Sequence, residues 1–205
     1  MRDNNAQSLA GGQDGRTYID YDWYAGGIPA NVELGRDVYI DTAYGFAPFF
    51  SEQTPGLSLG HASGAYDRTT FVVGTRGRIE VGAYTVLNGT YLVCHDRIKI
   101  GEHCLIAWGS VLTDTWAGIG EAPVEARRGV LRAAAVDEAR RLSPVVQPRP
   151  VTLEDNVWVG FDAVILPGVT LGRGSIVGCK TVIGEDVPPY AIMAGDPARV
   201  VRYLE

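Results

Sequence analysis

Three features that direct proteins to membranes or nucleic acids are missing from this sequence. No apolar run approaches the roughly 20 residues that are needed to cross a bilayer. The formal net charge is −6 and the pI is about 5.1, which argues against general binding to nucleic acids or anionic membranes. Residues 1–16 are polar, lack the apolar segment of a signal peptide and predict a disordered tail. We therefore expect no membrane insertion and no nucleic-acid partner.

Cysteine is also scarce. Cys94, Cys104 and Cys179 are an odd number and show no C-x-x-C spacing. Reduced thiols in a cytoplasmic protein are therefore the simplest interpretation. Cys104 falls at a small, inward position of the repeat described next, which favours a role in core packing.

The sequence is rich in a six-residue repeat of branched aliphatic residues. Helices repeat every 3.6 residues and amphipathic strands every 2, so neither explains a period of six. Such a period is typical of an all-β solenoid, in which each hexad supplies one face of a triangular coil. Its interior has no room for a site, so any chemistry must lie outside. The twelve positions are Val81, Leu87, Val93, Ile100, Ile106, Leu112, Leu153, Val159, Ile165, Leu171, Val177 and Ile183, with one extra residue between Val93 and Ile100.

Two regions outside the repeat predict additions to the solenoid. Residues 17–80 contain early hexads around Leu34 and Ile40 but are irregular and aromatic over 41–72, which predicts an N-terminal cap over the open end. The charged, alanine-rich insertion at about 116–150 predicts a helix that ends at prolines. This insertion is either a solvated helix or a lid for an anionic substrate or cofactor. The β-helix itself is predicted over 81–205.

The second block of repeats and the segment after it carry family motifs. They are VWVG at 157–160, PGV at 167–169 and DVPPYAIMAGDPAR at 186–199. These motifs resemble the hexapeptide-repeat acyltransferases, among them the galactoside, maltose and other sugar O-acetyltransferases. The resemblance implies a left-handed parallel β-helix and a homotrimer. It also implies acetyl-CoA or another acyl-CoA as cosubstrate, with acyl transfer to a hydroxyl or amine of a small-molecule acceptor.

Two family positions differ in this chain. The catalytic histidine of the family follows a segment like residues 106–117, and here Gly118 takes its place. The family's Thr-Lys pair before Asp-Val-Pro-Pro, which helps to hold CoA, is replaced by Gly184 and Glu185. The resemblance retains Arg199 and Arg202 at basic positions that can pair with the phosphates of CoA. It places the rest of the acyl-CoA along Trp158, Gly160, Cys179 and Lys180.

His95 is the candidate replacement for the missing base. His95 follows Val93 by two residues and Asp114 follows Leu112 by two, in consecutive predicted coils. Since coils stack about 4.8 Å apart, we expect His95 and Asp114 to be neighbours on one outer edge. There Asp114 would orient the imidazole, and Trp116 would form a wall of the acceptor pocket. The alternative is an ordinary pair of turn residues on a solvated edge.

Three functional interpretations remain open. The first is a CoA-dependent acyltransferase. The second is a catalytically reduced family member that binds a ligand or acts as a scaffold, which the lost histidine favours. The third is an enzyme of the same fold with a non-CoA substrate. We expect no metal site, because a zinc site like that of the carbonic anhydrases of this fold needs closely spaced histidines, and His95 and His103 lie eight residues apart on different faces.

Overall fold

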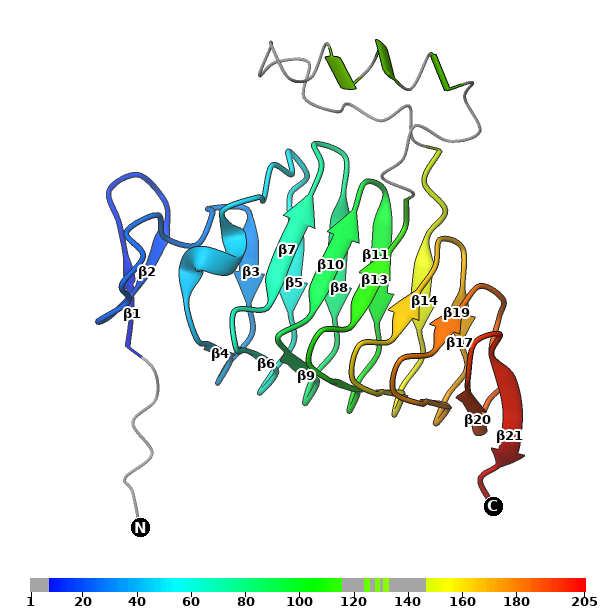
Figure 1. The fold of residues 1–205 in the computed structure, drawn as a ribbon. Coiled ribbons are helices and arrows are strands. Elements are labelled where there is room, and N and C mark those ends of the chain that lie inside the picture. The colour runs from blue at the N-terminus through cyan, green and yellow to red at the C-terminus, as the bar shows by residue number, and fades with distance from the viewer. Residues whose placement is uncertain (1–7, 116–123, 126–127, 130, 133–146) are drawn as a thin grey trace.

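The protein is a stack of three-sided coils built from short parallel strands (Figure 1). The computed structural model describes residues 8–115, 124–125, 128–129, 131–132 and 147–205. Each complete coil gives one strand to each of three sheets, in the same order along the chain. We number these sheets as faces 1, 2 and 3, and name each corner after the two faces that it joins. The predicted all-β solenoid is confirmed.

Face 1 is a parallel sheet of six strands. Its strands are β3 (Val32–Leu34), β5 (Leu57–Leu59), β8 (Arg78–Val81), β11 (Arg97–Ile100), β14 (Val151–Leu153) and β17 (Thr170–Leu171).

Face 2 has eight strands, and the last one pairs antiparallel with its neighbour to close the C-terminal end as a hairpin. Its strands are β4 (Tyr39–Ile40), β6 (Gly64–Tyr66), β9 (Val86–Asn88), β12 (Leu105–Ile106), β15 (Trp158–Val159), β18 (Ile176–Val177), β20 (Ala191–Ala194) and β21 (Arg199–Tyr203).

Face 3 is a parallel sheet of five strands. Its strands are β7 (Thr70–Val73), β10 (Tyr91–Cys94), β13 (Val111–Thr113), β16 (Val164–Ile165) and β19 (Val182–Ile183).

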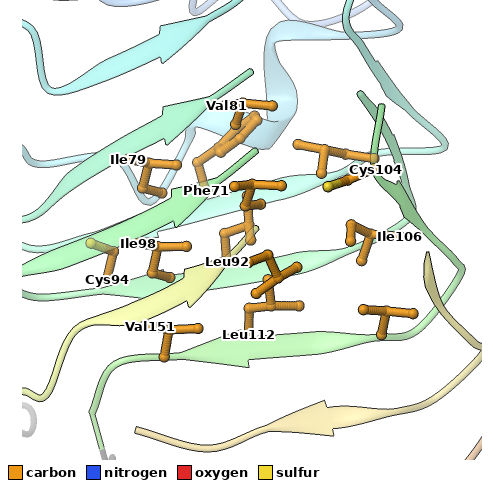
Figure 2. Packing of buried hydrophobic residues seen from close by; sticks show 14 of the residues in the cluster. Phe71, Ile79, Val81, Leu92, Cys94, Ile98, Cys104, Ile106, Leu112 and Val151 are labelled. Atoms are coloured by element: carbon orange, nitrogen blue, oxygen red, sulfur yellow. The ribbon is translucent and has the colours of Figure 1, made fainter. Parts of the chain in front are cut away.

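The core consists of aliphatic side chains stacked in columns. Eleven of the twelve predicted positions are buried, as the period-2 alternation of each short strand requires. Figure 2 shows Phe71, Leu92 and Leu112 stacked in one column. Cys104 is also buried, as predicted for a packing residue. Burial raises the pKa of its thiol, because a thiolate would lose its hydration there.

The prediction for Val93 is wrong. In β10, Leu92 fills the core column and pairs with Leu112, whereas Val93 pairs with Thr113 and is only half-buried. The turn that precedes β10 is short: Leu92 follows Leu87 by five positions, while Leu112 follows Ile106 by six. A slip of one residue exchanges the inward and outward side chains of a strand. Every residue that was placed by counting from Val93 is therefore displaced by one.

The N-terminal region is more ordered than the sequence predicts. Within the predicted disordered tail, β1 (Leu9–Gly11) pairs antiparallel with β2 (Thr17–Ile19), so that prediction is wrong from residue 9 onward. The region 41–72 also contains the 3₁₀ helix η1 (Ala43–Phe46) and a coil formed by β5, β6 and β7, and so is not irregular throughout. Phe46 of η1 is buried against Phe71 of the core, with ring centroids 4.9 Å apart. The aromatic segment thus covers the open end of the core.

The predicted helical lid at 116–150 lies largely outside the described residues, as do Trp116 and Gly118. Of this insertion, residues 124–125, 128–129 and 131–132 are helical. The chain enters the insertion at the corner 3–1, after β13 (Figure 1). No helix in the described part of the chain is long and apolar enough to span a bilayer.

Candidate functional site

The three faces differ in the side chains that they present outward. On face 1, Arg97 and Arg78 approach Glu80 at 3.0 and 3.2 Å, so this face carries paired charges. Faces 2 and 3 present mainly apolar side chains along consecutive strands. On face 2 these are Val86, Leu105, Trp158, Ile176 and Ile192, and on face 3 Tyr91, Val111, Val164 and Val182. Two adjoining apolar faces of this kind suit contact with a ligand or another protein surface.

Asp114 lies at the corner 3–1 and is fully buried. Its carboxylate accepts hydrogen bonds from the backbone N–H of His95 (2.9 Å to each oxygen), Asp96 (2.7 Å) and Arg97 (3.0 Å). Charge-assisted bonds of this type are stronger than neutral ones and compensate the burial of a carboxylate. Asp114 therefore fixes the backbone that carries His95.

The predicted pair between the His95 imidazole and Asp114 is not formed. The two residues do meet at one corner, but the register places Asp114 beside Cys94, and its side chain points inward. The half-buried imidazole of His95 lies instead over Gly74, where an added Cβ would sit 2.7 Å from Nδ1. Across the described residues, no hydrogen bond or ion pair joins this ring to Asp114. The one-residue slip at β10 is the physical reason.

Cys94 lies beneath the same corner. Burial raises the pKa of its thiol well above the usual range, and the negative charge of Asp114 raises it further. Its Sγ donates a hydrogen bond to the carbonyl of Arg78 at 3.3 Å. Cys94 is thus a protonated core residue and not a nucleophile.

Four of the residues assigned to the acyl-CoA gather on the C-terminal coils of face 2 and the corner 2–3. Trp158 pairs with Ile176 and is half-exposed. Gly160 lies so close to the next coil that an added Cβ would meet the backbone nitrogen of Cys179 at 2.8 Å. The backbone N–H of Lys180 donates to the carbonyl of Phe161 at 2.7 Å. The strict six-residue spacing therefore brings Trp158, Gly160, Cys179 and Lys180 together, and the side chains of all but glycine are exposed.

The two arginines lie on β21 at the end of the same face. Arg202 is paired with Ile192 of β20, and Ile192 is in turn paired with Ile176 of β18. Arg199 is paired with Ala194, and its guanidinium donates to the carbonyl of Ala198 at 2.7 Å. Both arginines are exposed and, as far as the structure describes the chain, neither has an ion-pair partner. Their charges remain available to an anion.

Two aromatic residues beside this cluster escaped the sequence analysis. Trp108 and Phe161 lie on consecutive coils of the corner 2–3, with ring centroids 5.5 Å apart, and both are about half-exposed. The indole N–H of Trp108 donates a hydrogen bond to Asp67. The sequence does contain a signal for this pair. Each aromatic residue immediately precedes Gly109 or Asp162, the corner residues at which the structure has a positive φ. Counting the hexads to these corners would have placed the two rings on consecutive coils.

The candidate residues thus form two groups that do not meet within one chain. His95 and Asp114 lie at the corner 3–1. The four residues assigned to the acyl-CoA, Trp158, Gly160, Cys179 and Lys180, lie on face 2 and the corner 2–3. The full width of face 3 separates them. His61 and His103 lie at the corner 1–2, on either side of Tyr84 at centroid distances of 5.2 and 5.0 Å. Within the described ranges, no three His, Cys, Asp or Glu side chains are grouped so that they could hold a metal ion.

Comparison with known proteins identifies the repeat segment. The profile of the bacterial transferase hexapeptide family (six repeats) matches residues 150–185. Galactoside O-acetyltransferase of Escherichia coli (strain K12) is 45% identical over 55 residues, which are 27% of this chain and 27% of that protein. A solved structure is also similar: the hexapeptide-repeat-containing acetyltransferase from Vibrio cholerae O1 biovar eltor, complexed with acetyl coenzyme A. Its sequence is 29% identical and the TM-score is 0.57. The match covers 73% of this chain and 72% of that chain.

A more distant solved structure shares the fold. AntD, an N-acyltransferase from Bacillus cereus in complex with dTDP and 3-hydroxybutyryl-CoA, is 17% identical with a TM-score of 0.57, and covers 85% of this chain and 81% of that chain. Residues 150–185 thus match the hexapeptide-repeat transferase family, and the fold is the left-handed parallel β-helix that the sequence predicts. The chain spans between 27% and 35% of the length of the curated relatives that it matches first.

Proposed function

We propose that this protein transfers an acetyl or other acyl group from CoA to a hydroxyl or amine of a small acceptor. The observation that carries the proposal is the surface formed by Trp158, Gly160, Cys179 and Lys180. This surface leads to Arg199 and Arg202, which have no ion-pair partner among the described residues. A pantetheine arm is long and slender, and it ends in phosphates. An open apolar strip with close-packed glycine and a basic end offers complementary contacts along its length.

We infer that a homotrimer completes the site. Faces 2 and 3 are both apolar, and a three-fold assembly can pack face 3 of one subunit against face 2 of the next. In that arrangement, the His95 corner of one subunit lies beside the acyl-CoA surface of its neighbour. The wide separation of the two groups within one chain supports this proposal, since neither group alone contains both a base and a donor surface.

His95 is our choice for the general base. Imidazole is the side chain that most often accepts a proton near neutral pH. The acceptor oxygen or nitrogen attacks the thioester carbonyl carbon and gives its proton to His95. The C–S bond then breaks, and the proton passes to the departing CoA thiolate. Asp114 holds the backbone of the corner, and Trp116 stays a predicted wall of the acceptor pocket.

A second candidate is a catalytically reduced family member that binds a ligand or a partner. Gly118 at the family's histidine position and the unformed pair between His95 and Asp114 favour it. A third is an enzyme of this fold that uses a non-CoA substrate. Both retain the fold but lack turnover with acyl-CoA. We place the protein in the cytoplasm, because its three free cysteines suit a reducing compartment.

The test is binding followed by turnover. Acetyl-CoA should raise the melting temperature in a concentration-dependent way, since a ligand of the folded state stabilises it by mass action. Release of the CoA thiol in the presence of amine and alcohol acceptors then measures transfer. Binding without transfer to any acceptor supports the reduced member. If neither acetyl-CoA nor longer acyl-CoAs shift the melting temperature, a CoA donor is excluded, and native mass spectrometry of co-purified ligand becomes the next experiment.

A further inference from the structure

The N-terminal cap contains a cavity that is separate from the residues assigned to the acyl-CoA. Its volume is about 530 Å³, and it lies between the β1–β2 loop and the first coils of the β-helix. The lining side chains that matter below are Asp14, Arg16, Phe50, Ser51, Glu52 and Thr75. A cavity of this size accommodates a small organic molecule.

The aromatic wall of the cavity is Phe50. Its neighbours Phe46 and Phe49 are buried, with 4% and 8% of their surfaces exposed, whereas 67% of Phe50 is exposed. The backbone N–H of Phe50 donates to the carbonyl of Val73 at 2.8 Å, so its position is fixed by the adjacent coil. An exposed aromatic ring held on a cavity wall offers a flat apolar surface to a ligand.

The charged groups of the cavity leave one carboxylate uncompensated. Asp14 approaches Arg16 at 3.8 Å and accepts a hydrogen bond from the Tyr18 hydroxyl at 2.7 Å. This bond and the backbone N–H of Arg16 lower the pKa of Asp14. Among the described residues, Glu52 has no ion-pair partner. The three charged side chains sum to −1, which favours a cationic ligand over an anionic one.

The cavity adjoins the segment on which the His95 ring rests. The backbone N–H of Glu52 donates to the carbonyl of Thr75 at 2.9 Å, and the His95 imidazole packs over the preceding residue, Gly74. The Gly74–Thr75 segment thus contacts both the cavity and the candidate base.

We propose that this cavity binds a small amine-bearing polyol, such as an amino sugar, in its ammonium form. Phe50 contacts the apolar C–H face of the ring and offers a cation–π contact. Glu52 pairs with the ammonium group, and the hydroxyl of Thr75 contacts those of the ligand. The Ser51 hydroxyl is already engaged, since it donates to the carbonyl of Gly77 at 2.6 Å and accepts from the backbone N–H of Gln53 at 3.2 Å. The proposal that this ligand binds depends only on the residues that line the cavity. The identification of this ligand as the acyl acceptor rests on the proposed function. Because an ammonium nitrogen has no lone pair, a hydroxyl of the bound ligand, or its amine after loss of a proton, is then the attacking group.

The experiment compares three ligands that share one ring shape but differ in charge. Saturation-transfer NMR on the full chain, without CoA, measures binding of glucosamine, N-acetylglucosamine and glucuronate. We expect glucosamine to bind about tenfold more tightly than N-acetylglucosamine, in line with one charge-assisted contact, and glucuronate to bind most weakly. Equal binding of the three ligands, or no binding of glucosamine, overturns the proposal.

Two variants and one control locate the site. Glu52→Gln should abolish the preference for glucosamine, and Phe50→Ala should weaken both amine and amide ligands about tenfold. Glu102→Gln is the matched control, because Glu102 is also an exposed carboxylate without an ion-pair partner in the described chain. Both Phe50 and Glu52 are exposed, so folding should be retained. Unchanged preference in Glu52→Gln overturns the proposal.

Acyl-CoA binding is measured separately on the same variants by thermal shift. If acetyl-CoA binds but glucosamine preference does not depend on Glu52, the cavity proposal fails and the proposed function stands. If glucosamine binds in a Glu52-dependent way but no acyl-CoA binds, the cavity proposal stands and the transferase proposal fails.

Discussion

The two ends of the β-helix are closed in different ways. At the C-terminal end, β20 and β21 continue face 2 as a hairpin, and all five residues of β21 are exposed. At the N-terminal end, η1 buries Phe46 against Phe71, which is at the N-terminal end of a core column, and the β1–β2 hairpin lies beyond η1. The first closure extends the repeat, whereas the second departs from it.

The two ends also carry the two proposed binding sites, one for the acyl donor and one for the acceptor. The regular C-terminal coils carry the segment that matches the family, residues 150–185, and with it the proposed acyl-CoA surface. The N-terminal cap lies outside that match and holds the cavity with Phe50 and Glu52. Under the two proposals, the regular repeat binds the donor and the irregular cap binds the acceptor.

The largest effect is expected at His95, because it lies where the cap cavity approaches the corner 3–1. His95→Ala should lower kcat about 10²–10⁴-fold, the usual contribution of a general base. Acetyl-CoA affinity and melting temperature should stay unchanged, since the ring makes no hydrogen bond or ion pair within the described residues. Steady-state kinetics with the preferred acceptor provides the measurement.

The control for His95 is His103→Asn. His103 is exposed at the corner 1–2 with a φ of 56°, which asparagine tolerates. Its replacement should leave kcat unaltered. A kcat for His95→Ala within about threefold of the unaltered protein would sink the base assignment and favour the ligand-binding interpretation.

The second effect concerns stability at the same corner. Asp114→Ala removes a buried carboxylate and leaves the N–H groups of His95, Asp96 and Arg97 without their acceptor. We expect a loss of about 3 kcal/mol in the free energy of unfolding, as for other buried charged partners. Urea denaturation measures this loss. Asp96→Ala, an exposed neighbour, should cost much less, and equal losses would contradict a special role for Asp114.

The C-terminal end is tested through its two arginines. Arg199→Ala and Arg202→Ala should each weaken acetyl-CoA binding about tenfold, with less effect at high salt, because each loses a charge-assisted contact to phosphate. Isothermal titration at two salt concentrations gives the comparison. Arg36→Ala is the control, since its side chain is also exposed, lies at the opposite end of the β-helix and approaches Asp37 at 3.4 Å. The same weakening in Arg36→Ala would show only a loss of overall charge.

The sequence determines much of the fold because the hexad spacing is uniform over the second block. Six residues separate Val159, Ile165 and Leu171, so the inward columns and the outward cluster around Gly160 follow from counting. Counting fails where a turn changes length. The five-residue step from Leu87 to Leu92 moves the register by one, and this reverses which side chains point inward.

The candidate site was predictable only in part for the same reason. The residues assigned to the acyl-CoA lie on coils of constant length, so counting along the sequence places them on neighbouring coils, and their role in binding stays a prediction. The pair between His95 and Asp114 depended on the miscounted register. The cap cavity has no periodic signal at all, since Asp14, Asn31, Phe50 and Thr75 come from four separate segments that only the folded chain brings together.

The smallest effect concerns the core beneath the corner. Burial raises the pKa of Cys94 above its ordinary value of 9.0, so the folded protein keeps the thiol protonated at a pH where the unfolded chain releases the proton. Stability contributed by this group is therefore fully present below pH 9 and falls as the pH rises through the unfolded value. From pH 8 to pH 10 the loss in the free energy of unfolding is about 1 kcal/mol.

Cys94→Ala should flatten this part of the pH profile of urea denaturation, although it lowers stability at every pH. Cys179→Ala, at the exposed corner of the acyl-CoA surface, should leave the slope unaltered. Equal slopes in all three proteins would show that Cys94 ionises as readily in the folded chain as in the unfolded one, and that the corner admits water to its core.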